Sequence, residues 1–208
     1  MNFSKFELGK LKWLASHEVV RRHPVRTIGR LVAWEIARLS NRPLSMTYDG
    51  CYHVDLYPNE GASRLTYYFG VSEPELFEFY NSFLRPGMVV IDAGANIGLH
   101  TLSFAKRVGP TGFVYAFEPG RASFKRLRGL VDQNGLTNVS CFNCALGAAV
   151  GNAAFTENQG DTSRSFVTKA PVSVDGEYVP VRSLDEVFKD DRTKKVDFAK
   201  IDVEGFEE

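Results

Sequence analysis

An aspartate and two glycines that follow an apolar run are the first residues in this sequence that could bind a ligand. The run from Val89 to Asp92 is typical of a short buried strand, and Gly94 and Gly98 stand in a turn that leads into a helical segment. A strand, a glycine turn and a helix in this order are typical of nucleotide-binding units. Glu118 ends the next predicted strand, 20 residues after Gly98, where an acidic residue can hydrogen-bond ribose hydroxyls.

The spacing within the turn argues against a phosphate-rich ligand. A P-loop needs a lysine directly after its last glycine, but Leu99 and His100 follow Gly98. A dinucleotide turn needs two glycines separated by one residue, and Gly94 and Gly98 are four apart. Asp92 would repel a pyrophosphate and attract a cation, unless it only caps the turn. S-adenosylmethionine fits, because it carries a ribose, an ammonium and a sulfonium but no phosphate.

A second polar group ends the strand predicted over 198–203. Lys200 and Asp202 share one face of this strand, and Glu204 follows it. A lysine and an aspartate in a central strand cost free energy unless they are paired or functional. We expect Asp202 and Glu204 to orient a substrate hydroxyl or to accept its proton. The alternative is a Lys200–Asp202 ion pair that only stabilises the cleft.

The end of the strand predicted over 139–144 could complete the pocket. Asn143 could hydrogen-bond near an adenine ring, and the small Ala145 would let the backbone approach the ring edge. Cys141 and Cys144 match C-x-x-C, but residues three apart in a strand point to opposite faces. A second pair of metal ligands at suitable spacing is missing, so we expect two small core residues and no metal site.

These candidate residues can meet only if helices connect the strands that carry them. Strands are predicted over 88–92, 113–118, 139–144 and 198–203, and helices over 98–108, 121–134 and 184–188. This alternation predicts an α/β fold with a doubly wound, mostly parallel sheet that binds its ligand at the carboxyl ends of its strands. Additional strands are expected over 48–58, 64–69, 153–156 and 178–181. A helix is expected after Ser72, which could form a capping box with Glu75.

Composition excludes several classes of protein. The chain has 208 residues, 44% of them hydrophobic, and its 25 Lys+Arg balance its 25 Asp+Glu. Because a general nucleic-acid binder would be strongly basic, we expect no nucleic-acid partner. Three cysteines make no disulfide framework, and no apolar run resembles a secretory signal or a membrane span. We therefore expect a soluble, cytoplasmic protein.

The charge is concentrated near the N-terminus. Residues 1–46 contain nine Lys/Arg against three Glu. Residues 24–39 have helical periodicity, and five apolar residues fall near one face: Val25, Ile28, Leu31, Val32 and Leu39. We favour a face that packs on the domain or on a second subunit, since such stripes usually belong to a core. The alternative is a basic amphipathic helix that touches a membrane surface or an acidic partner.

Several motifs together resemble the FkbM-type family of S-adenosylmethionine-dependent methyltransferases. They are Val90-Ile-Asp-Ala-Gly-Ala-Asn-Ile-Gly98, Phe117-Glu-Pro119, Ala145-Leu-Gly147, Ser183-Leu-Asp-Glu186 and Lys200-Ile-Asp-Val-Glu-Gly-Phe-Glu207. The resemblance covers residues 67–208 and implies a class I (Rossmann-like) methyltransferase fold. It also implies methyl transfer to a hydroxyl of a sugar, a polyketide or a related small molecule. Carried over, the cofactor-binding residues would be Asp92, Gly94, Asn96, Gly98 and Glu118, and Asp202 and Glu204 would face the reaction centre.

Three further expectations follow from the same resemblance. His100 replaces a residue that is more often aromatic in relatives, so it is either a packing residue or an acceptor-side base. The segment from Phe155 to Asp161-Thr162 resembles a family loop near the acceptor. The chain ends at Glu208, directly after the fourth core strand, so we expect the later strands of a seven-stranded sheet to be missing.

These observations divide the chain into three parts and leave two alternative functions. The parts are a basic helical extension (1–46), a strand hairpin with a helix (47–86) and the S-adenosylmethionine-binding core (87–208). One alternative is an NAD(P)-dependent oxidoreductase, which the missing glycine pair and Asp92 disfavour. The other is a catalytically inactive methyltransferase-like binding module.

Overall fold

A four-stranded parallel sheet forms the centre of the structure. The computed structural model describes residues 24–58, 60–71, 73–156, 166–168, 177–189 and 195–203. The sheet consists, in spatial order, of β10 (Phe198–Ile201), β3 (Val89–Ala93), β4 (Phe113–Phe117) and β5 (Val139–Phe142). In chain order the strands are therefore arranged 4-1-2-3, as where the two halves of a doubly wound sheet meet. The predicted α/β class and the four predicted core strands are confirmed.

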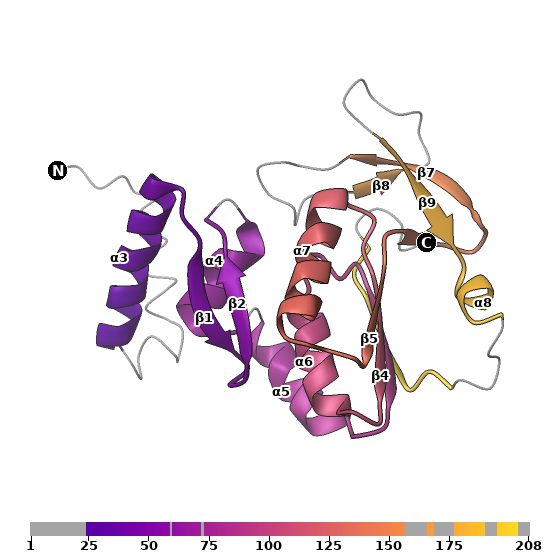
Figure 1. The fold of residues 1–208 in the computed structure, drawn as a ribbon, viewed down its shortest axis with the longest axis horizontal. Helices are drawn as coiled ribbons and strands as arrows, with labels where there is room; N and C mark the ends of the chain where they lie inside the picture. The colour runs from indigo at the N-terminus through magenta and orange to yellow at the C-terminus, as the bar shows by residue number, and fades with distance from the viewer. Residues whose placement is uncertain are drawn as a thin grey trace.

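Helices cover both faces of this sheet. The helices are α5 (Pro74–Phe83), α6 (Leu99–Val108), α7 (Arg121–Gln133) and the short α8 (Leu184–Val187). Figure 1 shows α5, α6 and α7 on one side of β4 and β5, with α8 on the opposite side. Val90 and Val114 pack toward the first side, whereas Ile91 and Tyr115 pack toward Val187 and Phe188. Apolar residues therefore alternate between two buried faces, which is why β3 reads as a continuous apolar run.

A second, smaller sheet interrupts the alternation between β5 and β10. Its strands are β6 (Ala145–Leu146), β9 (Glu177–Arg182), β7 (Gly151–Thr156) and β8 (Phe166–Thr168), in that order. β6 pairs with β9 in parallel, whereas β7 is antiparallel to both β8 and β9. The additional strands predicted over 153–156 and 178–181 are confirmed as β7 and β9, and both are slightly longer than predicted.

The segment before the core differs from the prediction at two places. The single strand expected over 48–58 is a hairpin of β1 (Leu44–Tyr48) and β2 (Tyr52–Leu56), in which Asp49 and Gly50 both have positive φ. The strand expected over 64–69 is wrong, because α4 (Gly61–Phe69) occupies these residues and buries Ser63, Thr66 and Tyr68. Ser72, one half of the expected capping box, lies outside the described residues. The helix expected after it is confirmed as α5, which begins at Pro74 with Glu73 as its N-cap.

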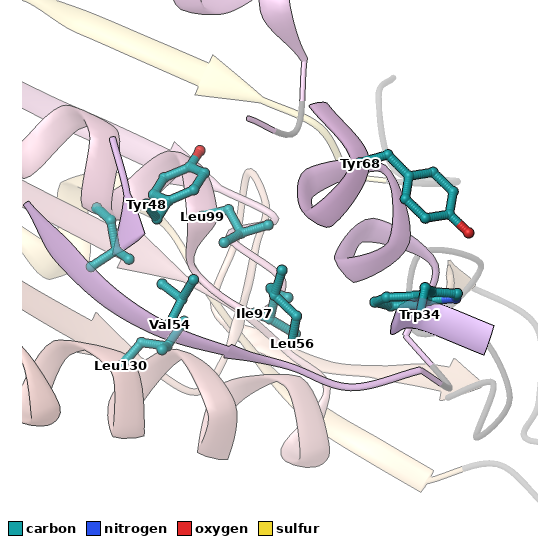
Figure 2. Close-up of a cluster of buried hydrophobic side chains, with 9 residues drawn as sticks. Trp34, Tyr48, Val54, Leu56, Tyr68, Ile97, Leu99 and Leu130 are labelled. Atoms are coloured by element: carbon teal, nitrogen blue, oxygen red, sulfur yellow. The ribbon is translucent and has the colours of Figure 1, made fainter. Parts of the chain in front are cut away.

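This N-terminal unit packs on the glycine turn and the helix that follows it. One buried cluster contains Trp34 of α3 (Pro24–Ser40), Tyr48, Val54 and Leu56 of the hairpin, Tyr68, Ile97, Leu99, Leu102 and Leu130. Figure 2 shows the cluster, with Trp34 and Tyr68 close together at one end. Arg126 of α7 adds an ion pair to Glu60, with 2.9 Å between Nε and Oε1. The hairpin and α4 therefore support the turn from the side opposite the sheet.

The structure corrects the prediction of which face of the helix over 24–39 is buried. α3 does form, but it buries Thr27, Trp34 and Ala37 rather than the predicted stripe. Val25, Ile28, Val32 and Leu39 are 55–83% exposed, and only Leu31 packs partly against the cluster. The favoured expectation was that this stripe packs on the domain or on a second subunit. Among the described residues the first of these is wrong, and packing on a second subunit stays a prediction. The apolar stripe faces away from the domain because the opposite face of the helix carries Trp34.

Candidate cofactor and acceptor site

The predicted site residues gather at one edge of the central sheet. Asp92 lies in β3, Glu118 and Asn143 directly follow β4 and β5, and Asp202 directly follows β10. The chain leaves β3 toward β4 on one side, while β10 joins β3 on the other side. This reversal of strand order is the position at which open α/β sheets bind their ligands. The structure thus brings together residues that are up to 110 positions apart in the sequence.

The turn after β3 depends on glycine for both conformation and space. Gly94, Asn96 and Gly98 all have positive φ, of 76°, 49° and 98°. A Cβ on Gly94 would overlap the carbonyl oxygen of Asp202, and one on Gly98 would lie 2.7 Å from Leu127 Cδ1. The glycines therefore allow β10 and α7 to approach the turn closely.

Glu118 connects the turn to the end of its own strand. Its Oε2 accepts a hydrogen bond from the backbone N–H of Asn96 (2.7 Å), and its Oε1 accepts one from Gly120 (2.9 Å). The Asn143 amide in turn donates to the carbonyl oxygens of Glu118 (2.8 Å) and Pro119 (2.9 Å). Three predicted cofactor residues, Asn96, Glu118 and Asn143, thus form one hydrogen-bonded group that fixes the loop geometry at this edge.

Asp92 is a fully buried carboxylate that is only partly satisfied. The Thr101 hydroxyl donates to its Oδ2 (2.6 Å), whereas Oδ1 has no hydrogen-bond partner among the described residues. Burial raises the pKa of Asp92 above its ordinary value, and the charge of the adjacent Lys200 and the Thr101 hydrogen bond partly offset this. An unpaired buried oxygen is costly, so Asp92 is suited to a ligand that brings a donor or a positive charge.

Lys200 and Asp202 form the ion pair that was one of the two predicted alternatives. Lys200 Nζ lies 3.0 Å from Asp202 Oδ2, and Lys200 stands opposite Asp92 in the register of β10 with β3. The Lys200 side chain is 11% exposed, whereas that of Asp202 is 62% exposed. The exposed carboxylate can therefore still contact a substrate while the lysine lies between two acidic groups.

His100 lies at the start of α6 and is neutral at physiological pH. Its Nδ1 lies 3.3 Å from the hydroxyl of Tyr80, and its Nε2 is 4.0 Å from Glu73 Oε1. Burial, together with the charge of Lys200, lowers the pKa of His100 to about 4. A neutral ring with this pKa is a weak base, so packing and hydrogen bonding describe His100 better than proton removal does.

The remaining predicted residues have other surroundings or lie outside the described part. Ala145 pairs with Val181 in the small sheet and is buried there with Phe155 and Val179. Glu204 and the loop residues Asp161-Thr162 lie outside the described residues. Burial raises the pKa of both Cys141 and Cys144 to about 11, and their side chains belong to clusters on opposite faces of the sheet. Within the described ranges there is no group of side chains suited to hold a metal ion.

Two residues near the site were not predicted from the sequence. Thr101 stands nine residues after Asp92, in the first turn of α6, and a hydroxyl at this place could have been noticed. Tyr80 comes from α5, and its ring packs edge-on against both His100 and Phe104. No local pattern indicates that contact, since it depends on how α5 packs against α6.

Comparison with solved structures gives short matches to methyltransferases. A SAM-dependent methyltransferase from Aquifex aeolicus is 31% identical over 34% of this chain and 37% of its own, with a TM-score of 0.31. A SAM-dependent O-methyltransferase from Thermotoga maritima is 26% identical over 34% of this chain and 28% of its own, with a TM-score of 0.31. An rRNA methylase from Streptococcus thermophilus is 19% identical over 35% of this chain and 38% of its own, also with a TM-score of 0.31. The chain thus spans less than two fifths of the length of these structures. No curated protein matches the chain.

A protein-family model gives a longer match. The model described as "Methyltransferase FkbM domain" matches residues 92–208, which is more than half of the chain. The match begins at Asp92 and includes the glycine turn, Glu118, β10 and Asp202. It agrees with the family that the sequence motifs resemble and argues against the oxidoreductase alternative. The chain belongs to the FkbM methyltransferase domain family.

Proposed function

We propose that this chain binds S-adenosylmethionine and supports methyl transfer to a hydroxyl oxygen of a sugar, a polyketide or a related small molecule. Membership in a methyltransferase family supports the reaction class. The observation that carries the choice of cofactor is Asp92 Oδ1, a fully buried oxygen without a hydrogen-bond partner among the described residues. When bound, S-adenosylmethionine would supply a methyl group on a positively charged sulfur. A hydroxyl oxygen that attacks the methyl carbon breaks the carbon–sulfur bond, and S-adenosylhomocysteine is the leaving group.

Asp92 is suited to the positively charged end of this cofactor. The ammonium group has several N–H donors, and one of them would satisfy Oδ1 without disturbing the hydrogen bond from Thr101 to Oδ2. A pyrophosphate in the same place would meet a buried carboxylate, and the low local dielectric would strengthen the repulsion. The same oxygen therefore favours one cofactor and disfavours the other.

Glu118 would contact the ribose while it holds the turn. Its two carboxylate oxygens accept backbone hydrogen bonds from Asn96 and Gly120. A carboxylate at this strand end is the type of acceptor that ribose hydroxyls meet in nucleotide-binding sheets. Gly94 and Gly98 let β10 and α7 pack closely against the turn, and the backbone N–H of Asn96 donates to Glu118. Asn143 and the backbone at Ala145 would border the adenine ring.

The acceptor hydroxyl would bind beside Asp202. Its exposed carboxylate can accept a hydrogen bond from the hydroxyl, and the ion pair with Lys200 holds that carboxylate in place. We propose that Glu204 assists in removing the proton, and that His100, being neutral, contributes a hydrogen-bonding position.

Calorimetry with S-adenosylhomocysteine, NAD and NADP tests the cofactor assignment. We expect binding of S-adenosylhomocysteine and none of either dinucleotide. Binding of a dinucleotide without binding of the sulfur ligand would overturn the proposal. The acceptor class is tested separately, by following the transfer of a labelled methyl group to a panel of sugar and polyketide hydroxyls. A transfer to nitrogen or carbon acceptors only would refute the oxygen assignment and leave the cofactor assignment intact.

A further inference from the structure

A cleft opens where α3, the turn between β1 and β2, and the end of α4 meet. One wall is formed by three residues of α3: Arg26, Thr27 and Arg30. The turn at Asp49-Gly50 and the last residues of α4 form the other walls. The cleft has a volume of about 300 Å³, at the lower end of the range of small-molecule sites. Its described lining residues all precede residues 92–208, so the match to the family model assigns no role to it.

This cleft lies away from the cofactor site. Asp49 pairs with Lys106 and Arg107, which stand in the last turn of α6. The turn that we assign to the cofactor ends at Gly98, before the first turn of the same helix. α6 has 10 residues and is about 15 Å long. The wall formed by Asp49 and the cofactor turn are therefore at opposite ends of α6.

The cleft has an excess of positive charge. Asp49 is the acidic residue among the described residues that line it, and its carboxylate already lies 2.9 Å from Lys106 Nζ and 2.6 Å from Arg107 Nη1. Neither Arg26 nor Arg30 pairs with a carboxylate in the part of the chain that the structure describes. Burial and the nearby charge of Arg26 both lower the pKa of Arg30. An anion in the cleft would relieve the repulsion between these two guanidinium groups.

Arg30 is held in position before a ligand binds. Its Nη1 donates to the carbonyl oxygen of Tyr68 (3.3 Å), and its guanidinium carbon lies 5.7 Å from the centroid of the Tyr67 ring. The hydrogen bond uses one of the five N–H donors of the guanidinium and fixes its orientation, so a ligand would order it at little entropic cost. Gly70 leaves the adjacent space open, because a Cβ there would lie 3.8 Å from Arg30 Nη1.

The remaining lining residues suit an organic group. Met46, Phe69 and Val71 are half-buried side chains that line the same cleft. Thr47 is exposed beside them and provides a hydroxyl. Small-molecule sites typically combine such apolar walls with a few polar groups that fix the orientation of the ligand.

We propose that this cleft binds the phosphate monoester of a small organic molecule. Arg26 and Arg30 stand on successive turns of one face of α3, and a doubly charged phosphate has three terminal oxygens with which to accept hydrogen bonds from both. A carboxylate has only two oxygens, and one guanidinium can occupy both of them. The organic group would lie against Met46, Phe69 and Val71. S-adenosylmethionine carries no phosphate, so the ligand of this cleft is a different molecule from the proposed cofactor.

Calorimetry of the full chain with phenyl phosphate tests the proposal. We expect binding that strengthens as the pH rises through about 6, where the phosphate group loses its second proton. Inorganic phosphate and benzoate should both bind more weakly. Arg26→Gln and Arg30→Gln should each weaken the binding of phenyl phosphate about tenfold. Arg38→Gln is the matched control, because Arg38 lies on the same helix and pairs with Glu35 outside the cleft.

The controls separate a lost site from a lost fold and from a different ligand. Arg26 is exposed, so Arg26→Gln should leave the melting temperature unchanged. Absence of phenyl phosphate binding, or equal binding in Arg26→Gln and Arg30→Gln, would overturn the proposal. Benzoate or inorganic phosphate that binds as tightly as phenyl phosphate would refute the monoester assignment, and so would tighter binding of a single-stranded oligonucleotide. Displacement of phenyl phosphate by S-adenosylhomocysteine would place it in the cofactor site and would also overturn the proposal.

Discussion

The carbonyl oxygen of Asp202 occupies the space that a Cβ on Gly94 would need. The backbone N–H of Asp202 also donates to the carbonyl oxygen of Ala93, at 3.0 Å. The turn that we assign to the cofactor and the strand end that we assign to the acceptor are thus packed directly on each other. A substitution in the turn should therefore displace the end of β10, and a substitution at the end of β10 should displace the turn.

Gly94→Ala should destabilise the fold and displace the end of β10. The new Cβ would overlap a backbone atom, and φ of 76° is unfavourable for alanine, so we expect a loss of about 3 kcal/mol in the free energy of unfolding. Chemical denaturation measures the loss. Gly129→Ala is the matched control. It lies within α7 with nothing within 4 Å of the added Cβ, and it should stabilise the protein by about 0.5–1 kcal/mol. Equal effects of the two changes would contradict the packing of β10 on the turn.

Glu118→Gln should weaken cofactor binding more than it weakens the fold. The amide that replaces one carboxylate oxygen cannot accept a hydrogen bond, so either Asn96 or Gly120 loses its partner. We expect binding of S-adenosylhomocysteine to weaken about tenfold to a hundredfold, as measured by calorimetry. Glu78→Gln, at an exposed position on α5, should change nothing. Unchanged affinity in Glu118→Gln would remove Glu118 from the binding site.

Asp92→Asn should separate function from stability. The pKa of Asp92 is raised, so ionising it costs more in the folded chain than in the unfolded chain, and this cost grows as the pH rises through the folded value. At neutral pH the neutral asparagine should therefore preserve or raise the melting temperature. Loss of the charge should nevertheless weaken binding of the ammonium end about tenfold or more. Asp132→Asn, an exposed residue of α7, is the control. A variant that is less stable and binds S-adenosylhomocysteine normally would show that Asp92 is only structural.

His100 should make the protein sensitive to acid. The folded chain keeps the ring neutral down to a pKa of about 4, whereas the unfolded chain protonates it near 6.5. Between these values the unfolded state binds more protons, so stability is complete above about 6.5 and falls as the pH falls toward 4. We expect His100 to account for about 3 kcal/mol of this loss. Denaturation curves across this range measure it, with His100→Asn as the comparison. If that variant loses as much stability on acidification as the original chain, another group causes the effect.

The segment before the core shows where sequence patterns misled the prediction. Residues 64–69 are rich in Thr, Tyr and Phe, which favour strands, but tertiary packing against Trp34 holds them in α4. The hairpin did have a local signal, because Asp49-Gly50 between alternating apolar residues is typical of a tight turn. The exposed stripe on α3 could not be predicted, since both faces of that helix contain apolar residues and only packing decides which face is buried.

The sequence by itself determined the alternation of strands and helices, the glycine turn with its acidic residues, and membership in a methyltransferase family. These features depend on local periodicity and on residue types at short spacings, which a single chain displays directly. Only the tertiary structure decided how the acidic groups are used. It leaves Asp92 Oδ1 without a hydrogen-bond partner among the described residues, and it engages Glu118 with two backbone N–H groups. It also pairs Asp202 with Lys200 and lowers the pKa of His100 to about 4. Burial and long-range contacts determine all four of these features. Neither burial nor a long-range contact can be read from a single position in the sequence.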